Sequence, residues 1–141
     1  MKFILLIAIL FYAGVDFQTK IRPEYKVTPF TVTAVPDDLQ GAGESYYLTE
    51  KDKRDANFIC ITNYIVALLY VNGKPVRLKA KRQLRVSDKK NSYFNGKYEL
   101  IIDNGPEKTD GEENYIMKAT IILKYNSKVV WMKNVMGEGG D

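Results

Sequence analysis

The sequence contains no histidine and only one cysteine among its 141 residues. Histidine is the commonest general base near neutral pH and the commonest metal ligand, so its absence argues against an enzyme and against a metal site. A lone cysteine excludes an intramolecular disulfide. That residue, Cys60, stands between Ile59 and Ile61. An apolar setting of this kind predicts a buried thiol that does not react.

Recognisable catalytic motifs are also missing, including G-x-S-x-G, the P-loop and a Cys–His pair. The adjacent acids Asp37–Asp38 and Glu112–Glu113 would point to opposite faces of a strand, so neither pair predicts an acid–base dyad. The acidic segment Asp103–Glu113 lacks the spacing of a calcium loop and contains Lys108. We therefore predict a non-enzymatic protein without cofactor or metal. The enzymatic alternative is a hydrolase that uses carboxylates and tyrosine, which would need two acids in one cleft.

No apolar run reaches the length of about 20 residues that a transmembrane helix needs. Met1–Lys2 precedes a short apolar run over residues 3–15, which Asp16 ends. One positive charge before such a run is typical of a secretory signal peptide. We expect residues 1–17 to be a signal peptide and residues 18–141 to be a single β-rich domain, exported to the periplasm or the extracellular space, so that the chain meets a membrane only in passage. The alternatives are a buried first element of a cytosolic protein and an uncleaved anchor.

Aromatic residues are abundant, with ten tyrosines and six phenylalanines, and such residues are enriched in strands. Phe30–Val35 alternates apolar and polar residues, as a half-buried strand does. Asn72–Gly73 separates two strand-like runs and is the strongest β-hairpin signal in the chain, because both residues tolerate positive φ. Asn95–Gly96 and Asn126–Ser127 predict two further hairpins.

Helical periodicity is nearly absent, and the best helical candidate is the short segment Lys51–Asn57. Asp103–Asn114 is polar and contains glycine and proline, which predicts a long loop. Gly137–Asp141 is rich in small residues, so we expect a mobile tail. Several short strands with regular turn signals predict an all-β fold: a small antiparallel β-barrel or sandwich of about 7–9 strands with hairpin connections.

A basic segment spans Lys74–Lys90, within a chain of net charge +4. If Val76–Lys81 is a strand, its basic residues share one face and its apolar residues share the other. This segment supplies the predicted partner-binding site, here called the basic ridge: Arg77, Lys79, Lys81, Arg82 and Arg85. Such a ridge would attract an anionic protein, lipid headgroups or a glycan. Nucleic acid is not expected as a partner of an exported protein. The alternative interpretation is a solubilising face on an edge strand.

The favoured interpretation is therefore an exported, non-catalytic binding module for another macromolecule. A small-ligand carrier with a cavity inside a barrel is an alternative, and it would require a sizeable apolar pocket. Ser92–Tyr93 ahead of the strand Tyr98–Ile102 is similar to small exported β proteins of Gram-negative bacteria, among them lysozyme inhibitors of the small β-barrel type. This resemblance implies a periplasmic, inhibitor-like protein as a further alternative. The chain lacks the paired cysteines that many such inhibitors use, so no residue role is carried over.

Overall fold

The computed structural model describes residues 24–85, 88–111 and 113–140. The predicted signal peptide, residues 1–17, lies outside the described residues. Within them, no helix combines the length and the apolar character needed to cross a membrane.

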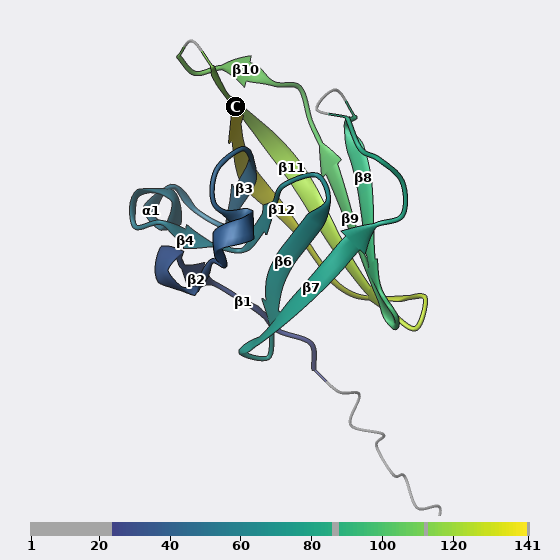
Figure 1. Cartoon of the computed structure of the whole chain (residues 1–141). Helices are drawn as coiled ribbons and strands as arrows, with labels where there is room; N and C mark the ends of the chain where they lie inside the picture. Colours follow the sequence, from purple (N-terminus) through teal and green to yellow (C-terminus); the bar gives the residue numbers. More distant parts are fainter. Residues whose placement is uncertain (1–23, 86–87, 112, 141) are drawn as a thin grey trace, which may run out of the picture.

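Eight antiparallel strands form a closed barrel in which consecutive strands of the chain lie side by side (Figure 1). In order around the barrel the strands are β3 (Gly43–Tyr47), β5 (Cys60–Thr62), β6 (Val66–Val71), β7 (Lys74–Ala80), β8 (Lys90–Asn95), β9 (Tyr98–Asn104), β11 (Asn114–Tyr125) and β12 (Lys128–Gly140). The pairing of β12 with β3 closes the circle. The predicted all-β fold is confirmed, and of the two predicted architectures the barrel is correct.

All three predicted hairpins are present. Asn72 and Gly73 join β6 to β7 with φ angles of 52° and 77°, as a type I′ turn requires. Asn126 and Ser127 also have positive φ, at 48° and 64°, between β11 and β12. In the third hairpin Asn95 still belongs to β8 and pairs with Tyr98. The turn there is one residue later than the sequence signal indicates.

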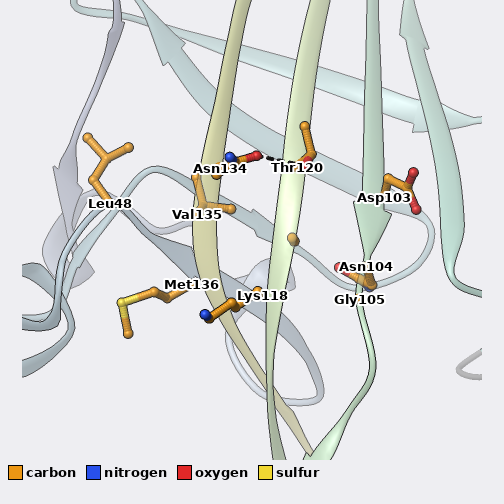
Figure 2. Close-up of a pocket in the computed structure, with 10 residues that line it drawn as sticks. Leu48, Asp103, Asn104, Gly105, Lys118, Thr120, Asn134, Val135 and Met136 are labelled. Atoms are coloured by element: carbon orange, nitrogen blue, oxygen red, sulfur yellow. Dashed lines mark hydrogen bonds between the residues drawn. The ribbon is translucent and has the colours of Figure 1, made fainter.

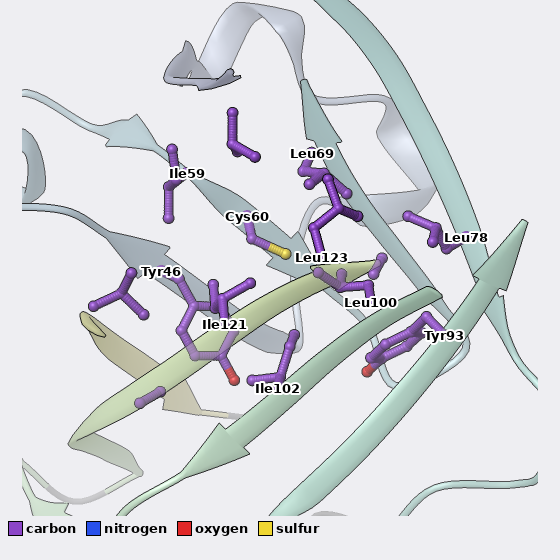
Figure 3. Packing of buried hydrophobic residues seen from close by; sticks show 14 of the residues in the cluster. Tyr46, Ile59, Cys60, Leu69, Leu78, Tyr93, Leu100, Ile102, Ile121 and Leu123 are labelled. Carbon is purple, nitrogen blue, oxygen red and sulfur yellow. The ribbon is translucent and has the colours of Figure 1, made fainter. Parts of the chain in front are cut away.

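Alternate side chains of the strands point into the barrel and form its apolar core (Figure 3). The most deeply buried members are each at most 1% exposed: Tyr46, Ile59, Cys60, Ala67, Leu69, Leu78, Tyr93, Leu100, Ile102, Ile121 and Leu123. An eight-stranded barrel is just wide enough to be filled by side chains or to hold one small ligand. Here apolar side chains fill the middle of the barrel. Cys60 is among them, which confirms the predicted buried thiol.

One end of the barrel is closed by three tyrosines. Tyr98 and Tyr125 face each other where β9 begins and β11 ends, with ring centroids 5.0 Å apart. Tyr25, just before β1 (Val27–Thr28), packs 5.2 Å from the Tyr125 ring. Aromatic pairs at such separations add about 0.5–1.5 kcal/mol each beyond the area that they bury. Three partly buried rings therefore pack together at this end.

A second apolar cluster lies outside the barrel, against the outward side chains of β3, β5 and β6. The covering elements are β2 (Phe30–Thr31), the 3-10 helices η1 (Val32–Ala34) and η2 (Asp37–Leu39), α1 (Glu50–Arg54) and β4 (Asn57–Phe58). The members of the cluster are Phe30, Val35, Leu39, Tyr47, Phe58, Ile61, Val66 and Leu68. The predicted strand over residues 30–35 is thus wrong beyond Thr31. The chain turns there because Val35 and Leu39 must reach the outer face of the sheet.

The predicted mobile tail is also wrong for residues 137–140, which form the end of β12. They pair with both β3 and β11. The glycines are needed because large side chains cross this strand: a Cβ on Gly139 would lie 2.4 Å from the ring of Tyr115, and a Cβ on Gly137 would lie 2.9 Å from the ring of Tyr46. The glycine-rich segment therefore closes the barrel while leaving room for two tyrosines.

Two smaller predictions are confirmed with shifted boundaries. The short helix predicted at residues 51–57 is α1, which begins one residue earlier and ends at Arg54. Its first turn is capped by the Thr49 hydroxyl, which accepts a hydrogen bond of 3.1 Å from the backbone N–H of Asp52. The loop predicted at residues 103–114 contains the short strand β10 (Lys108–Thr109), which pairs with β11.

Candidate functional site

The basic ridge runs along β7 and into the connection that follows it. Arg77 and Lys79 are exposed on either side of the buried Leu78, so the predicted division of β7 into a basic face and an apolar face is confirmed. Lys81, Arg82 and Arg85 are also exposed, in the β7–β8 connection. β7 pairs with β6 and with β8. The pairing with β8 is confined to Lys79 and Ala80 at the end of β7, so β7 is not a free edge strand there, and the solubilising role of its basic face stays a prediction.

Several ridge residues already have partners. The Arg77 guanidinium donates to both carboxylate oxygens of Asp38 in η2, at 2.5 and 3.3 Å. This hydrogen bonding is the main reason why the pKa of Asp38 is lowered. Arg82 lies 3.3 Å from Asp88, and the Lys81 ammonium lies 3.9 Å from the centre of the Phe94 ring, within cation–π range.

The remaining members, Lys79 and Arg85, have no ion pair within 4.0 Å among the described residues. Lys79 projects from the middle of the sheet, opposite Phe94. Arg85 uses its backbone N–H, which donates to the Asp88 carboxylate at 2.8 Å. The charge of the ridge that is free for a partner therefore lies mainly on these two side chains and on Lys81.

A polar cluster occupies the inside of the barrel at the end opposite Tyr25, Tyr98 and Tyr125. We call this the polar end. Its centre is Glu44 on β3, which is only 1% exposed. The Glu44 cluster consists of Glu44, Tyr46, Tyr64, Asn104 and Tyr115. Sequence reasoning did not identify it.

The Glu44 carboxylate accepts three hydrogen bonds from neutral groups. The Tyr46 hydroxyl and the Asn104 amide, the latter at 3.1 Å, donate to Oε2. The Tyr115 hydroxyl donates to Oε1 at 2.9 Å. A hydrogen bond of 2.9 Å links the hydroxyls of Tyr115 and Tyr64. A buried charge commonly requires an opposite charge nearby, yet every side chain that donates to Glu44 here is uncharged.

Glu44 contributes to the raised pKa values of other groups in the interior. Burial first, and then the Glu44 charge, raises the pKa of Tyr46. The same two effects raise the pKa of the Cys60 thiol, which makes the reactive thiolate harder to form. Burial is again the main cause of the raised pKa of Tyr115, where the hydrogen bond with Tyr64 adds to it. All of these groups remain protonated near neutral pH.

Three further polar side chains lie beside this cluster: Thr62, Asn91 and Tyr93, which are 2%, 1% and 0% exposed, respectively. Burial raises the pKa of Tyr93, and a hydrogen bond with the Thr62 side chain lowers it less strongly, so these two hydroxyls lie within reach of each other. Asn91 Oδ1 has no hydrogen-bond partner among the described residues. Figure 3 shows the ring of Tyr93 among the core side chains.

A signal for this site was present in the sequence. Residues of a strand alternate between its two faces, so an inward Tyr46 places Glu44 inside the barrel as well. The burial of β3 follows this pattern, with Glu44 and Tyr46 at most 1% exposed. An acidic residue in phase with the core of a predicted strand therefore indicates a buried carboxylate. Its partners could not be found in this way, because they come from β9, β11 and the β5–β6 connection.

Two depressions share part of their lining on β11 and β12. One has a volume of about 650 Å³ and lies over β9, β11 and β12 (Figure 2), with Lys118 and Met136 in its lining and with the Thr120 hydroxyl donating to Asn134 at 2.9 Å. The second, of about 470 Å³, shares Lys118 and Met136 and adds Lys53 and Lys108. Their linings combine apolar side chains with charged ones.

No known protein family, curated protein or solved structure matches this chain. In the part of the chain that the structure describes, no group of three or more Cys, Asp or Glu side chains is arranged to hold a metal ion.

Proposed function

We propose that this protein is an exported, non-catalytic binding module that docks an acidic protein partner through the basic ridge. The observation that carries the proposal is the exposure of Lys79, at the paired end of β7, and of Lys81 and Arg85 in the connection that follows it. A rigid scaffold presents charges in a fixed pattern, which favours specific recognition. The pattern of residues 1–17 supports export.

An acidic protein is a better partner than a membrane or a polyanionic glycan because acids are interleaved with the ridge. Asp38 and Asp88 already pair with Arg77 and Arg82, and Asp103 lies opposite Lys90 across the β8–β9 pair. A uniformly anionic surface would be repelled by these acids. A protein surface can place its own charges between them, and such complementarity selects the partner.

The other functions considered have less support. A small-ligand carrier depends on an apolar cavity, whereas apolar side chains fill the middle of the barrel. A carboxylate-dependent hydrolase depends on two acids in one cleft. The hydrogen-bond partners of Glu44 are instead tyrosine and asparagine.

The test is capture of partners from envelope and extracellular extracts by the purified protein and by two charge-reversal variants. The ridge variant carries Lys79→Glu and Arg85→Glu, which leaves the Arg77–Asp38 pair intact. The matched control carries Lys128→Glu and Lys133→Glu, the same charge change on exposed residues of β12. Capture should weaken as salt rises, because screening shortens the range of surface charges.

The proposal requires that an acidic protein is captured by the native protein and by the β12 variant but not by the ridge variant. Equal capture by all three proteins would remove the ridge from the function. Binding to anionic lipid vesicles or to a sulfated glycan, lost in the ridge variant while no protein is captured, would assign the ridge to that other class of partner and overturn the proposal.

A further inference from the structure

A second site, separate from the basic ridge, lies on the outer face of β11 and β12. The depression of about 470 Å³ is lined there by Ile116, Lys118 and Met136. Ala119 and Val135, the neighbours of Lys118 and Met136 along the two strands, belong to the barrel core. Because successive side chains of a strand point to opposite faces, the three lining side chains point away from that core. We call this depression the lysine groove. Its volume lies within the range of about 300–1,000 Å³ that small-molecule pockets occupy.

The rest of the lining comes from α1, on the side of β3, and from the segment that leads into β10. Contacts within the protein hold both of these segments. The Lys53 ammonium of α1 lies 3.4 Å from the Glu138 carboxylate on β12. On the other side β10 pairs with β11, and the Gly105 N–H donates to the Lys118 carbonyl at 2.7 Å. The groove is therefore largely preformed, as small-molecule sites usually are.

Positive charge exceeds negative charge in the lining. Its charged residues are Lys53, Lys108, Lys118 and Glu50. Lys53 is already paired with Glu138. Lys108 and Lys118 are exposed, and neither has an ion pair within 4.0 Å among the described residues. Two unpaired ammonium groups thus stand against one carboxylate, which favours a ligand with a single negative charge.

Both unpaired lysines stand beside apolar side chains. Lys108 is opposite Ile116 in the β10–β11 pair, and Lys118 is opposite Met136 in the β11–β12 pair (Figure 2). Ile116 and Lys118 are two positions apart, which is about 7 Å along the strand. Ile116 and Met136 are half-buried and belong to neither apolar cluster of the protein. Their remaining apolar surface is therefore free to contact a ligand.

We propose that the lysine groove binds a free amphiphilic anion: an alkyl chain of medium length that carries one anionic headgroup. The headgroup pairs with Lys108 and Lys118, while the chain covers Ile116 and Met136, whose flexible thioether adapts to the chain. A cationic amphiphile is repelled by the two lysines, and a small hydrophilic anion leaves the apolar side chains uncovered. A whole protein surface fits less well, because a specific interface takes about 20–30 residues on each side, whereas ten residues line the groove.

The test titrates sodium octanoate, below its micelle concentration, into the full-length protein at pH 7 and constant ionic strength. Octylammonium, octan-1-ol and acetate serve as the cationic, neutral and chain-free counterparts. We expect saturable NMR shifts of the Ile116 and Met136 methyl groups with octanoate, binding of octan-1-ol at least about fivefold weaker, and no saturable shift with octylammonium or acetate. Octylammonium that binds as tightly as octanoate would overturn the proposal. So would methyl shifts that appear only with vesicles of anionic phospholipid, which would assign the groove to a membrane surface.

Two matched double variants test the lysines. Lys108→Gln with Lys118→Gln should lower the octanoate affinity about fivefold, which corresponds to about 1 kcal/mol, since exposed ion pairs contribute modestly. Lys128→Gln with Lys133→Gln removes the same charge from exposed residues of β12 that do not line the groove, and this variant should bind octanoate as the native protein does. Equal losses in the two variants would show a general charge effect and would exclude the groove as the headgroup site.

A series of chain lengths tests the apolar part without any substitution. Complete burial of one CH₂ group raises affinity about fourfold, so an open groove that buries about half of each group should give about a twofold gain per CH₂ from butanoate through hexanoate to octanoate. An affinity that does not change along the series would mark a site for the headgroup alone and contradict the proposal. None of these outcomes bears on the basic ridge, because Lys79 and Arg85 do not line the groove.

Discussion

Replacing Gly43 by alanine should weaken the barrel strongly, because this glycine allows β3 to approach β5 closely. A Cβ on Gly43 would lie 1.9 Å from the carbonyl oxygen of Thr62 and 3.0 Å from its carbonyl carbon. These are backbone atoms of the neighbouring strand, so no side-chain rotation can relieve the overlap. The Thr62 carbonyl must move, and with it the pairing of Glu44 with Thr62.

The matched control is Gly41→Ala. Gly41 has a φ angle of 111°, and a Cβ there would meet nothing within 4 Å. Its replacement measures backbone strain alone, about 1–3 kcal/mol. Overpacking against fixed atoms adds about 1–3 kcal/mol or more. We therefore expect Gly43→Ala to lower the free energy of unfolding by about 3–5 kcal/mol, a large share of the total of about 5–15 kcal/mol for a typical domain.

The assay is urea unfolding followed by far-UV circular dichroism and by the fluorescence of Trp131, the single tryptophan of the chain. With a denaturant slope of about 1–3 kcal/mol per molar urea, an excess loss of about 2 kcal/mol places the midpoint of Gly43→Ala about 1 M below that of Gly41→Ala. Midpoints that coincide, or an order in which Gly41→Ala is the less stable, would refute the steric argument and the close approach of β3 to β5.

Three further predictions concern other parts of the molecule. Truncation after Met136 should abolish cooperative thermal unfolding, because residues 137–140 supply most of the β12–β3 pairing that closes the barrel; a sharp transition in near-UV circular dichroism would contradict this. Cys60 should react with a thiol reagent only in denaturing urea, since burial raises its pKa and its exposure is 1%; fast labelling of the native protein would show that the interior opens. The hydrogen bond with Arg77 lowers the pKa of Asp38 below 3.8 in the folded protein. The Asp38–Arg77 pair therefore stabilises the folded state fully above pH 3.8, and this stabilisation is lost as the pH falls through the lowered pKa of Asp38. The Tm of Asp38→Asn should therefore lie below that of the native protein at pH 6 and approach it at low pH, and a gap that persists in acid would exclude the ion pair as the cause.

Local features of the sequence were sufficient for the hairpins. The residue pairs 72–73 and 126–127 form turns with positive φ, because Asn and Gly tolerate this conformation and their effect acts within a few residues of chain. The faces of β7 could be assigned in the same way, from the alternation of Arg77, Leu78 and Lys79. These predictions succeeded because they depend on backbone sterics and on strand periodicity, which do not require knowledge of the neighbouring strand.

Other features were decided only by tertiary contacts. The segment after Thr31 leaves the strand that its alternation predicts, because Val35 and Leu39 gain more by covering β6. The glycine-rich residues 137–140, read in isolation, resemble a mobile tail, yet they are ordered by pairing with β3, which lies about ninety positions earlier in the chain.

The polar end shows the same limit most clearly. Strand alternation places Glu44 in phase with Tyr46 on one face of β3. Its donors, Asn104 and Tyr115, lie 60 and 71 positions away. Only the closure of the barrel brings them together, because a buried carboxylate takes its partners from whichever strands surround it. The sequence thus determined the hairpin turns and the basic face of β7, whereas the fold determined where β2 and β12 end and what each inward side chain meets.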